Sequence, residues 1–394
     1  MKLHENSFCF SLLALSWLVG DTLALAADLI VSANDAKYVR VLGRDTYPGG
    51  TGPDTLTVLD ASRFPPEVKA TVEVEHTIIG PPQAVAITPN GKLAIVGAPT
   101  RYDYAAKKVI FDTFLQVIDL EATPPKLIDK IELGQHSQGL SINPAGILLL
   151  AGTVGGTVAV LAIEGKTVKL VEQIEVSAKR VSGISFTHDG RAALVALRDE
   201  QGMVVLDVDG SRVTNSQERV TTGVSPYSVD VSSDGGWAVV SNVGLPGMPG
   251  NVGRLFGDAD SVTLIDVSKR PFRAVQHFTV PSIPEGVAIS PDGKWIAVQS
   301  MDGSNLTEDN PGRHPRGRVL LFAIRDGQAV KTSDLPGGEA GQGIVFTADN
   351  KYILVQFNVE KQLAVYAVND GDMKDTQQRI VLSGGPASLR SMPR

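Results

Sequence analysis

The length, charge and cysteine content of the sequence exclude several classes of protein. Its 394 residues carry a formal net charge of −7 at pH 7, which argues against a general nucleic-acid-binding surface because such surfaces are strongly basic. The single cysteine, Cys9, lies near the N-terminus, so the rest of the chain can form neither a disulfide nor a thiolate metal site.

Residues 1–26 have the pattern of a secretory signal peptide. Phe8–Val19 is largely apolar, and Ala24-Leu-Ala26 fits a cleavage site of small residues. A membrane anchor is the alternative, but Asp21 interrupts the apolar run, which is short for a spanning helix. No later run is long and apolar enough to span a membrane. We therefore expect a periplasmic or secreted protein with no membrane span after cleavage.

A hairpin phrase recurs along the rest of the chain. Its clearest copy, Ile283–Ser300, has two runs of small and β-branched residues, which suit buried strands. Between them, Pro291-Asp-Gly-Lys294 has the chemistry of a tight turn. Five near-copies occupy Pro82–Val96, Ser137–Leu150, Val181–Val195, Pro226–Val240 and Gly341–Val355. A repeat of this length with several short strands is typical of a β-propeller.

Each copy continues into two further strands, so that four strands make one blade. A third strand often ends in Asp, as in Gln116–Asp119, and a more polar fourth strand follows, as in Lys126–Leu133. Pro386–Ser391 has the pattern of an innermost strand without partners, and Asp28–Asn34 that of a second strand without its first. The predicted fold is all-β, a single seven-bladed β-propeller over residues 27–394. A blade shared between the N- and C-terminal strands closes it and leaves no free sheet edge.

The connections between second and third strands differ greatly in length. The long ones are Gly43–Asp54, Thr100–Asp112, Val243–Asp260 and Met301–Gly317, whereas Val154–Gly156 is short. In a propeller these connections share one face with the entry to each innermost strand, so we expect that face to be functional. Neutral drift in surface loops is the alternative. The third loop carries Leu245, Met248, Leu255 and Phe256, which suggests a lid or a docking loop, or packing on a neighbouring loop.

The second position of each repeat should lie at the mouth of the central channel. The residues there are Gln83, Gln138, Ser182, Tyr227, Glu285, Gln342 and Ala387. His136 and Arg180 come just before two of them. Such a ring could bind a polar ligand or hold an ordered column of water.

Two carboxylates are candidate catalytic residues. Asp230 stands on an innermost strand where other repeats have small residues, and a carboxylate there must be paired or hydrated. A structural hydrogen bond is the alternative to a catalytic base. Asp230 and Glu285 together could act in acid–base chemistry or hold a cation.

The loop Met301–Arg318 has an acidic first half and a basic second half. Arg313, His314 and Arg316 could hold a carboxylate or phosphate, or they could neutralise the acidic half. The acidic half lacks the order of an EF-hand, and motifs for haem attachment, nucleotides, serine hydrolases and zinc proteases are absent. We therefore expect no metal and no cofactor. His76, His188 and His277 are expected at the surface.

Three segments resemble the YVTN-type and lactonase-like seven-bladed propellers: Pro284–Lys294, Val239–Asn242 and Val355–Asn358. The resemblance covers most of the chain after residue 26 and implies the fold. It also implies membership of a group that includes sugar-lactone hydrolases, muconate-cyclising enzymes, subunits of periplasmic amine dehydrogenases and binding proteins. No lactonase catalytic set matches residue by residue, so no catalytic residue is carried over.

The leading hypothesis is a periplasmic binding or scaffold protein that engages a protein partner or a small polar, anionic ligand on the long-loop face. The first alternative is a lactonase-like hydrolase, in which Glu285 or Asp230 activates water and Arg180, Arg313 or Arg316 stabilises the oxyanion. The second is a subunit of a periplasmic oxidoreductase. Whether the protein is an enzyme stays open at this stage.

Overall fold

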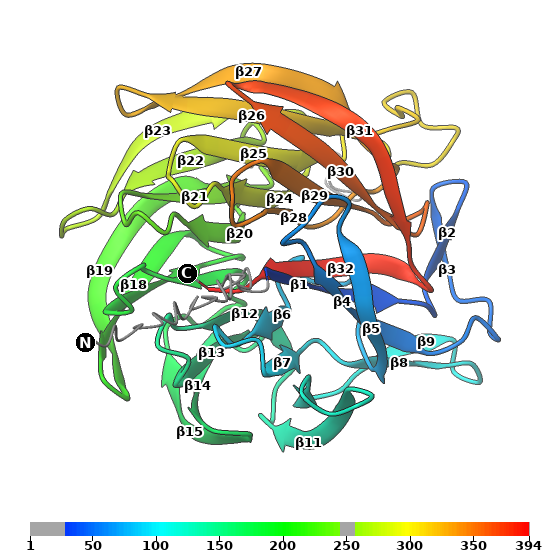
Figure 1. Ribbon diagram of the computed structural model, residues 1–394, viewed down its shortest axis with the longest axis horizontal. Coiled ribbons are helices and arrows are strands. Elements are labelled where there is room, and N and C mark those ends of the chain that lie inside the picture. The colour runs from blue at the N-terminus through cyan, green and yellow to red at the C-terminus, as the bar shows by residue number, and fades with distance from the viewer. Residues whose placement is uncertain (1–27, 245–256, 394) are drawn as a thin grey trace, which may run out of the picture.

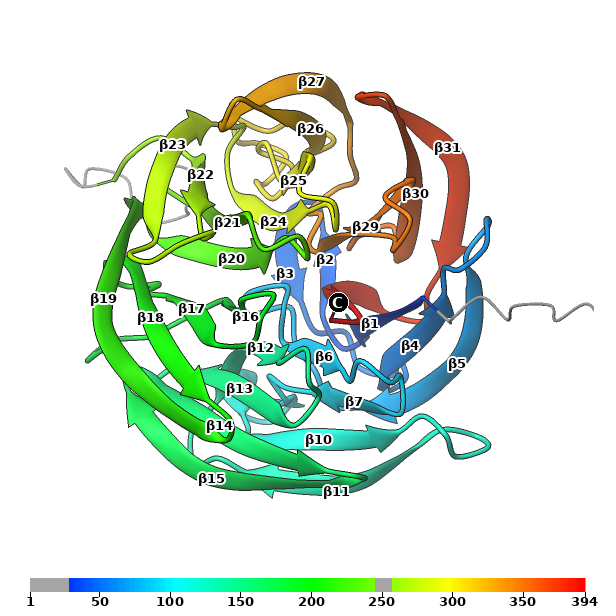
Figure 2. The ribbon, with the colours of Figure 1, turned by 60° about the vertical axis from the view of Figure 1, so that its left-hand side comes forward.

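The computed structural model describes residues 28–244 and 257–393, and it shows a seven-bladed β-propeller (Figure 1). Each blade is a four-stranded antiparallel sheet, and the innermost strands surround a common axis (Figure 2). The predicted fold class is therefore confirmed. The predicted signal segment, 1–26, lies outside the described residues. Within the described part of the chain, no helix is long and apolar enough to cross a membrane.

Six blades follow one another along the chain, each running from its innermost to its outermost strand. The first three blades comprise β6 (Val85–Ile87), β7 (Leu93–Val96), β10 (Phe114–Asp119) and β11 (Lys126–Glu132); β12 (Ser137–Ile142), β13 (Leu148–Thr153), β14 (Thr157–Glu164) and β15 (Thr167–Glu175); and β16 (Ile184–Phe186), β17 (Ala192–Ala196), β18 (Gln201–Asp209) and β19 (Arg212–Val224). The next three comprise β20 (Pro226–Val231), β21 (Trp237–Asn242), β22 (Ser261–Asp266) and β23 (Arg273–Thr279); β24 (Pro284–Ile289), β25 (Trp295–Ser300), β26 (Arg318–Arg325) and β27 (Gln328–Pro336); and β28 (Ile344–Phe346), β29 (Tyr352–Phe357), β30 (Gln362–Asn369) and β31 (Asp372–Val381).

The seventh blade joins the two ends of the chain. Its strands, from the axis outward, are β32 (Gly385–Ser391), β1 (Leu29–Asp35), β4 (Asp54–Asp60) and β5 (Glu67–Val74). β1 and β32 are antiparallel, with Val31 opposite Arg390 and Ala33 opposite Ser388. The predicted closure is thus confirmed, and β1 has hydrogen-bonded neighbours on both sides.

The repeated turn and the small third position of each repeat have direct structural reasons. Gly293 and Asn350 adopt left-handed φ values of 66° and 61°, a conformation that Gly and Asn accept more readily than other residues. At Gly286, an added Cβ would lie 2.5 Å from the carbonyl oxygen of Gln342, at the entry to the next innermost strand. Converging strands therefore exclude larger side chains at this position.

The apolar core lies between neighbouring blades rather than at the axis. For example, Leu150 of β13 and Val195 of β17 belong to one buried cluster, which joins the second and third blades. Each sheet is covered on both faces in this way, which explains the nearly continuous apolar runs of the second and third strands. Burial of these runs provides the main driving force for folding.

The two faces of the disc differ. One face, here called the turn face, carries the tight turns that join first to second and third to fourth strands. The other, the loop face, carries the remaining connections, including the four long ones. The connection before β4 begins at Ala36 rather than at the predicted Gly43 and forms the ribbon β2 (Val39–Val41) and β3 (Arg44–Thr46). The connection before β10 forms a second ribbon, β8 (Thr100–Asp103) and β9 (Lys108–Phe111).

Candidate functional site at the loop-face mouth

The side chain of Gln83 crosses the central channel. The Gln83 amide nitrogen donates to the Val229 carbonyl oxygen over 2.9 Å, and its amide oxygen accepts from the Val229 backbone N–H over 3.0 Å. Both residues are buried. Because this amide already bridges two blades, we leave Gln83 out of the candidate ligand site.

A cavity of about 110 Å³ lies in the channel and is lined by Asp230 and Arg390. Asp230 accepts a hydrogen bond from the Ile289 N–H over 2.9 Å, and its other oxygen is 3.5 Å from the Arg390 guanidinium. Arg390 also donates to the Ile184 carbonyl oxygen. Asp230 is thus held by the next blade and, across the channel, by the closing blade, as the structural alternative predicted.

A pocket of about 300 Å³ lies at the mouth of the channel on the loop face. Its lining consists of Ile79, Gly80, Phe111, His136, Gln138, Val154 and Arg180. Three of the predicted ligand-binding residues, His136, Gln138 and Arg180, are therefore brought together. They come from the entries to two consecutive innermost strands, as the repeat register predicted.

His136 presents a hydrogen-bond acceptor at this pocket. Its Nδ1 lies 2.9 Å from the Asp112 carbonyl oxygen, and because a carbonyl can only accept, Nδ1 carries the proton. Burial lowers the pKa of His136, so the ring is neutral near pH 7 and Nε2 has a free lone pair. Nε2 is buried and finds no hydrogen-bond partner within residues 28–244 and 257–393.

Arg180 presents a donor at the same pocket. Its Nη2 is held by the Asp199 carboxylate over 2.8 Å. Its Nε–H is buried and has no partner in the described part of the chain. A buried donor without a partner is costly, so this atom suits an acceptor supplied by a ligand.

A second polar group adjoins Arg180 and surrounds Glu285. Burial raises the pKa of Glu285 to about 7, although Arg198 and Arg40 oppose the shift. The Arg198 guanidinium lies 4.2 Å from the centre of the Tyr227 ring, and burial and Glu285 raise the pKa of Tyr227. Tyr227 and Glu285, both predicted ligand-binding residues, therefore share one electrostatic environment with two arginines.

The backbone before this group is held in an uncommon conformation. Ser225, Ile283 and Ala340 have positive φ values of 59°, 54° and 48°. Each stands two residues before a predicted mouth residue, namely Tyr227, Glu285 or Gln342. Left-handed conformations of non-glycine residues cost free energy and concentrate at functional sites. The amide oxygen of Gln342 is buried and unpartnered among the residues that the structure describes.

The ribbon β2–β3 brings Arg40 towards this mouth. Arg40 pairs with Asp45 over 2.7 Å within the ribbon. An added Cβ on Gly43 would lie 2.1 Å from the Leu306 carbonyl oxygen, so the tip of the ribbon rests on the loop 301–317. This close packing, which requires glycine, fixes the position of Arg40.

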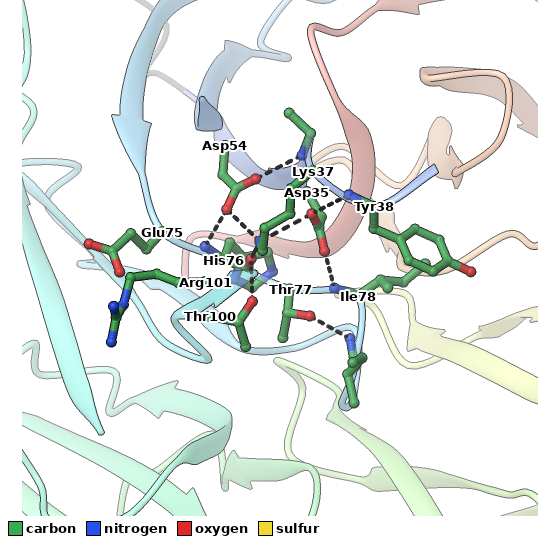
Figure 3. Close-up of polar contacts among 12 residues, drawn as sticks. Asp35, Lys37, Tyr38, Asp54, Glu75, His76, Thr77, Ile78, Thr100 and Arg101 are labelled. Carbon is green, nitrogen blue, oxygen red and sulfur yellow. Dashed lines mark hydrogen bonds and ion pairs between the residues drawn. The ribbon is translucent and has the colours of Figure 1, made fainter. Parts of the chain in front are cut away.

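A buried ionic cluster holds the segment that carries Ile79 (Figure 3). Lys37 Nζ lies 2.6 Å from Asp54 and 3.1 Å from Asp35. Asp54 accepts from the His76 N–H over 3.0 Å, and Asp35 accepts from the Ile78 N–H over 3.1 Å. The cluster thereby ties the start of the β2–β3 connection to one wall of the pocket.

The expectation that His76 lies at the surface is wrong. Its ring is fully buried, with Nδ1 2.9 Å from the Gly97 carbonyl oxygen and Nε2 3.1 Å from the Ser388 hydroxyl. Burial lowers the pKa of His76 to about 4. It lies on the connection from β5 to β6, between the first blade and the innermost strand of the closing blade, a contact that the sequence pattern could not reveal.

The basic half of the loop 301–317 serves mainly the loop itself. Arg313 donates to the Ser304 and Leu306 carbonyl oxygens and pairs with Glu339 over 3.0 Å. His314 Nδ1 lies 2.8 Å from the Asp302 carbonyl oxygen and 3.2 Å from the Asp302 carboxylate, and Arg316 is exposed. Only the His314–Asp302 contact matches the alternative of neutralising the acidic half, so we leave all three out of the candidate site.

Residues 245–256, which carry the four apolar side chains of the predicted lid, lie outside the described residues. Among those that are described, no group of three or more His, Cys, Asp or Glu residues could hold a metal ion.

Sequence reasoning missed Arg198 and Arg40. Arg198 stands at a strand end where the repeat motif has a different residue, and that departure was a usable signal. Arg40 gave no such signal, because it precedes the predicted start of its loop. The apolar lining residues Ile79, Phe111 and Val154 were also missed, since single apolar residues in loops are common.

The fold defines a seven-bladed β-propeller. No family model and no curated protein matches the chain. It is similar to the structure of a putative 6-phosphogluconolactonase from Bacteroides uniformis, with 15% identity and a TM-score of 0.67 over 93% of this chain and 100% of that one. It is also similar to a periplasmic gluconolactonase of Pseudomonas aeruginosa, with 17% identity and a TM-score of 0.65 over 93% and 99%. A third similar structure is hydrazine synthase of Kuenenia stuttgartiensis, with 18% identity and a TM-score of 0.58 over 80% of this chain and 90% of that one. At these identities the likeness shows the fold alone.

Proposed function

We propose that this protein is an exported YVTN-type propeller, formed by residues 27–394, that binds a small anionic ligand at the loop-face mouth of its channel. One observation carries the proposal: a concave pocket is lined by His136 and Arg180, each of which has a buried polar atom without a partner among the described residues. Arg198 and Arg40 add positive charge around Glu285, beside Arg180. Concave sites with convergent polar groups are typical of ligand binding, and guanidinium groups suit carboxylates and phosphates.

Export rests on separate support. The N-terminal 26 residues have the signal-peptide pattern, and one structural neighbour is described as periplasmic. N-terminal sequencing of the protein from the periplasm of a bacterial expression host tests this. A mature chain that starts near Ala27 is expected, and an intact N-terminus in the cytoplasm would contradict export.

Calorimetric titration with gluconate and 6-phosphogluconate tests the binding site. Arg180→Gln and Arg198→Gln should each weaken binding by about tenfold or more, since a hydrogen bond to a charged group contributes about 1.5–3 kcal/mol. Arg212→Gln is the matched control, because Arg212 is exposed on the turn face. Anion binding that survives both substitutions at the mouth would place the site elsewhere.

Lactone hydrolysis is the second candidate, and the raised pKa of Glu285 favours it. A general base works best with a pKa near the operating pH, and the pKa of Glu285 is about 7. The two functions differ in pH dependence. Hydrolysis requires ionised Glu285 and should accelerate as pH rises from 6 to 8, whereas binding of an anion should weaken because ionised Glu285 repels it. Rates and affinities of wild type and Glu285→Gln over this range decide between them.

A further inference from the structure

One wall of the loop-face pocket is apolar and exposed. Ile79, Phe111 and Val154 expose 39%, 46% and 41% of their surface, and all three line the pocket. They come from three separate connections: the one between β5 and β6, the β8–β9 ribbon, and the turn between β13 and β14. Large apolar side chains that converge on one concave site indicate contact with an apolar part of a ligand.

This wall is preorganised. The Phe111 ring meets the His136 ring edge-to-face at 4.9 Å, which joins the apolar wall to the polar end of the pocket. The ribbon that carries Phe111 is braced by Tyr102, whose ring stacks on Tyr47 at 4.2 Å. A wall of fixed shape loses little conformational entropy when a ligand binds.

The polar end specifies two different groups. The buried Arg180 Nε–H requires an acceptor, and the cationic guanidinium favours a carboxylate. The neutral His136 ring requires a donor at Nε2, such as a hydroxyl group. A sugar acid could satisfy this end, but its other hydroxyl groups would be buried against the apolar wall without partners, which is costly.

We propose that the ligand of this mouth is an amphipathic hydroxycarboxylate: a carboxylate for Arg180, an adjacent hydroxyl for His136, and an aryl or branched alkyl body against Phe111, Ile79 and Val154. The pocket volume of about 300 Å³ is at the lower end for ligand sites, so the ligand is compact. The inference rests on the proposed function, because it concerns the same mouth, and it specifies the ligand class.

Calorimetric titration of the full chain with four probes tests the inference. Mandelate carries all three groups, lactate lacks the aryl body, benzyl alcohol lacks the carboxylate, and gluconate replaces the apolar body with hydroxyl groups. Mandelate should bind about tenfold or more tightly than each of the others. Phe111→Ser should weaken mandelate about tenfold and leave lactate unchanged, whereas Arg180→Gln should weaken both.

Matched variants separate recognition from folding. Val171→Ser, on the outermost strand β15, removes a side chain that is 57% exposed, and it should change no affinity. Val154→Ser should repeat the effect of Phe111→Ser in a different connection. Tighter binding of gluconate than of mandelate, or equal affinities, would overturn the inference and leave the proposed function intact. Failure of all three carboxylates to bind would overturn both.

Discussion

The Gln83 side chain bonds across the channel to both backbone groups of Val229, and we therefore expect it to contribute to stability. Its amide donates to one of these buried groups and accepts from the other. Gln83→Ala should leave both unpaired and lower the free energy of unfolding by about 1–3 kcal/mol, the usual cost of unsatisfied buried polar groups. Urea denaturation measures this loss.

Gln138→Ala is the matched control for Gln83→Ala. Gln138 is equally buried, but among the described residues its amide bonds only to the carbonyl oxygen of the preceding residue, Ser137, over 3.2 Å. Gln138→Ala should lower the free energy of unfolding clearly less than Gln83→Ala does. Equal midpoints for the two variants would contradict a bridging role for Gln83.

Glu285 should make stability depend on pH in a defined direction. Its pKa is raised from 4.5 to about 7 by burial, so the folded state holds more protons than the unfolded chain between these values. Stability therefore falls as pH rises through this window. Glu285→Gln resembles the protonated form, so it should match wild type near pH 4.5 and exceed it at pH 8 by on the order of 2 kcal/mol. Thermal unfolding at both pH values measures the difference, with Glu172→Gln, at an exposed position of β15, as control. A variant less stable than wild type at pH 8 would contradict this assignment.

The repeat register predicted part of this site and could not predict the rest. Position two of the repeat placed Tyr227, Glu285 and Gln138 at the mouth, because the register fixes where each innermost strand begins. The partners of these residues depend on how the ring curves and on which loops reach over it. Arg40 approaches Glu285 from a blade two positions away in the ring, and no local pattern encodes such a contact.

Among the elements, the two loop-face ribbons show the limit of turn signals. Their long connections were predicted from length alone, but not as hairpins. The β2–β3 turn is Leu42-Gly43, with φ values of 53° and 74° at the two residues. A two-residue hairpin turn with positive φ at both positions usually has Asn or Asp first. Leu42 gives no such signal, and only Gly43 meets the requirement without strain.

The connection that carries the β2–β3 ribbon depends on Lys37. Its ammonium group lies between the carboxylates of Asp35 and Asp54, and all three side chains are largely buried. Lys37→Met keeps the apolar stem but leaves two buried carboxylates without a cation. Removal of one partner from a buried ion pair costs about 3–5 kcal/mol, and chemical denaturation should show a loss of this order.

Lys69→Met is the control for Lys37→Met. Lys69 lies 3.7 Å from Asp60, and its side chain is 50% exposed. Surface pairs of this kind contribute about 0–1 kcal/mol. The loss from Lys37→Met should also shrink at low pH, because burial already raises the pKa of Asp35 and protonation removes the unpaired charge. A loss that grows on acidification would show that the cluster does not act through charge.

At the scale of the whole molecule, the sequence was sufficient to predict seven blades and their closure. Each blade repeats one local pattern of turn and strand, so six copies were visible. The segments at the two ends could be matched to one another because the C-terminal end had an innermost strand without a second, and the N-terminal end had a second strand without an innermost one. The bond of Gln83 across the channel was not predictable. Gln83 has the same repeat position as Gln138, and only the ring geometry places Val229 opposite Gln83.

The closing blade should decide whether the ring folds cooperatively. β32 pairs with β1 and carries Ser388 and Arg390. Ser388 bonds to His76 on the connection to the first blade, and Arg390 pairs with Asp230 on the fourth blade. A chain that ends at Leu382 loses this strand and exposes the edge of β1, which invites aggregation. It should melt broadly and elute as aggregates. A chain that ends at Met392 keeps β32 and the Met392 N–H bond to the Leu29 carbonyl oxygen, and it should melt like the full-length protein. Scanning calorimetry and size-exclusion chromatography compare the two, and a sharp, monomeric transition for the shorter chain would mean that the ring holds without the innermost strand of its closing blade.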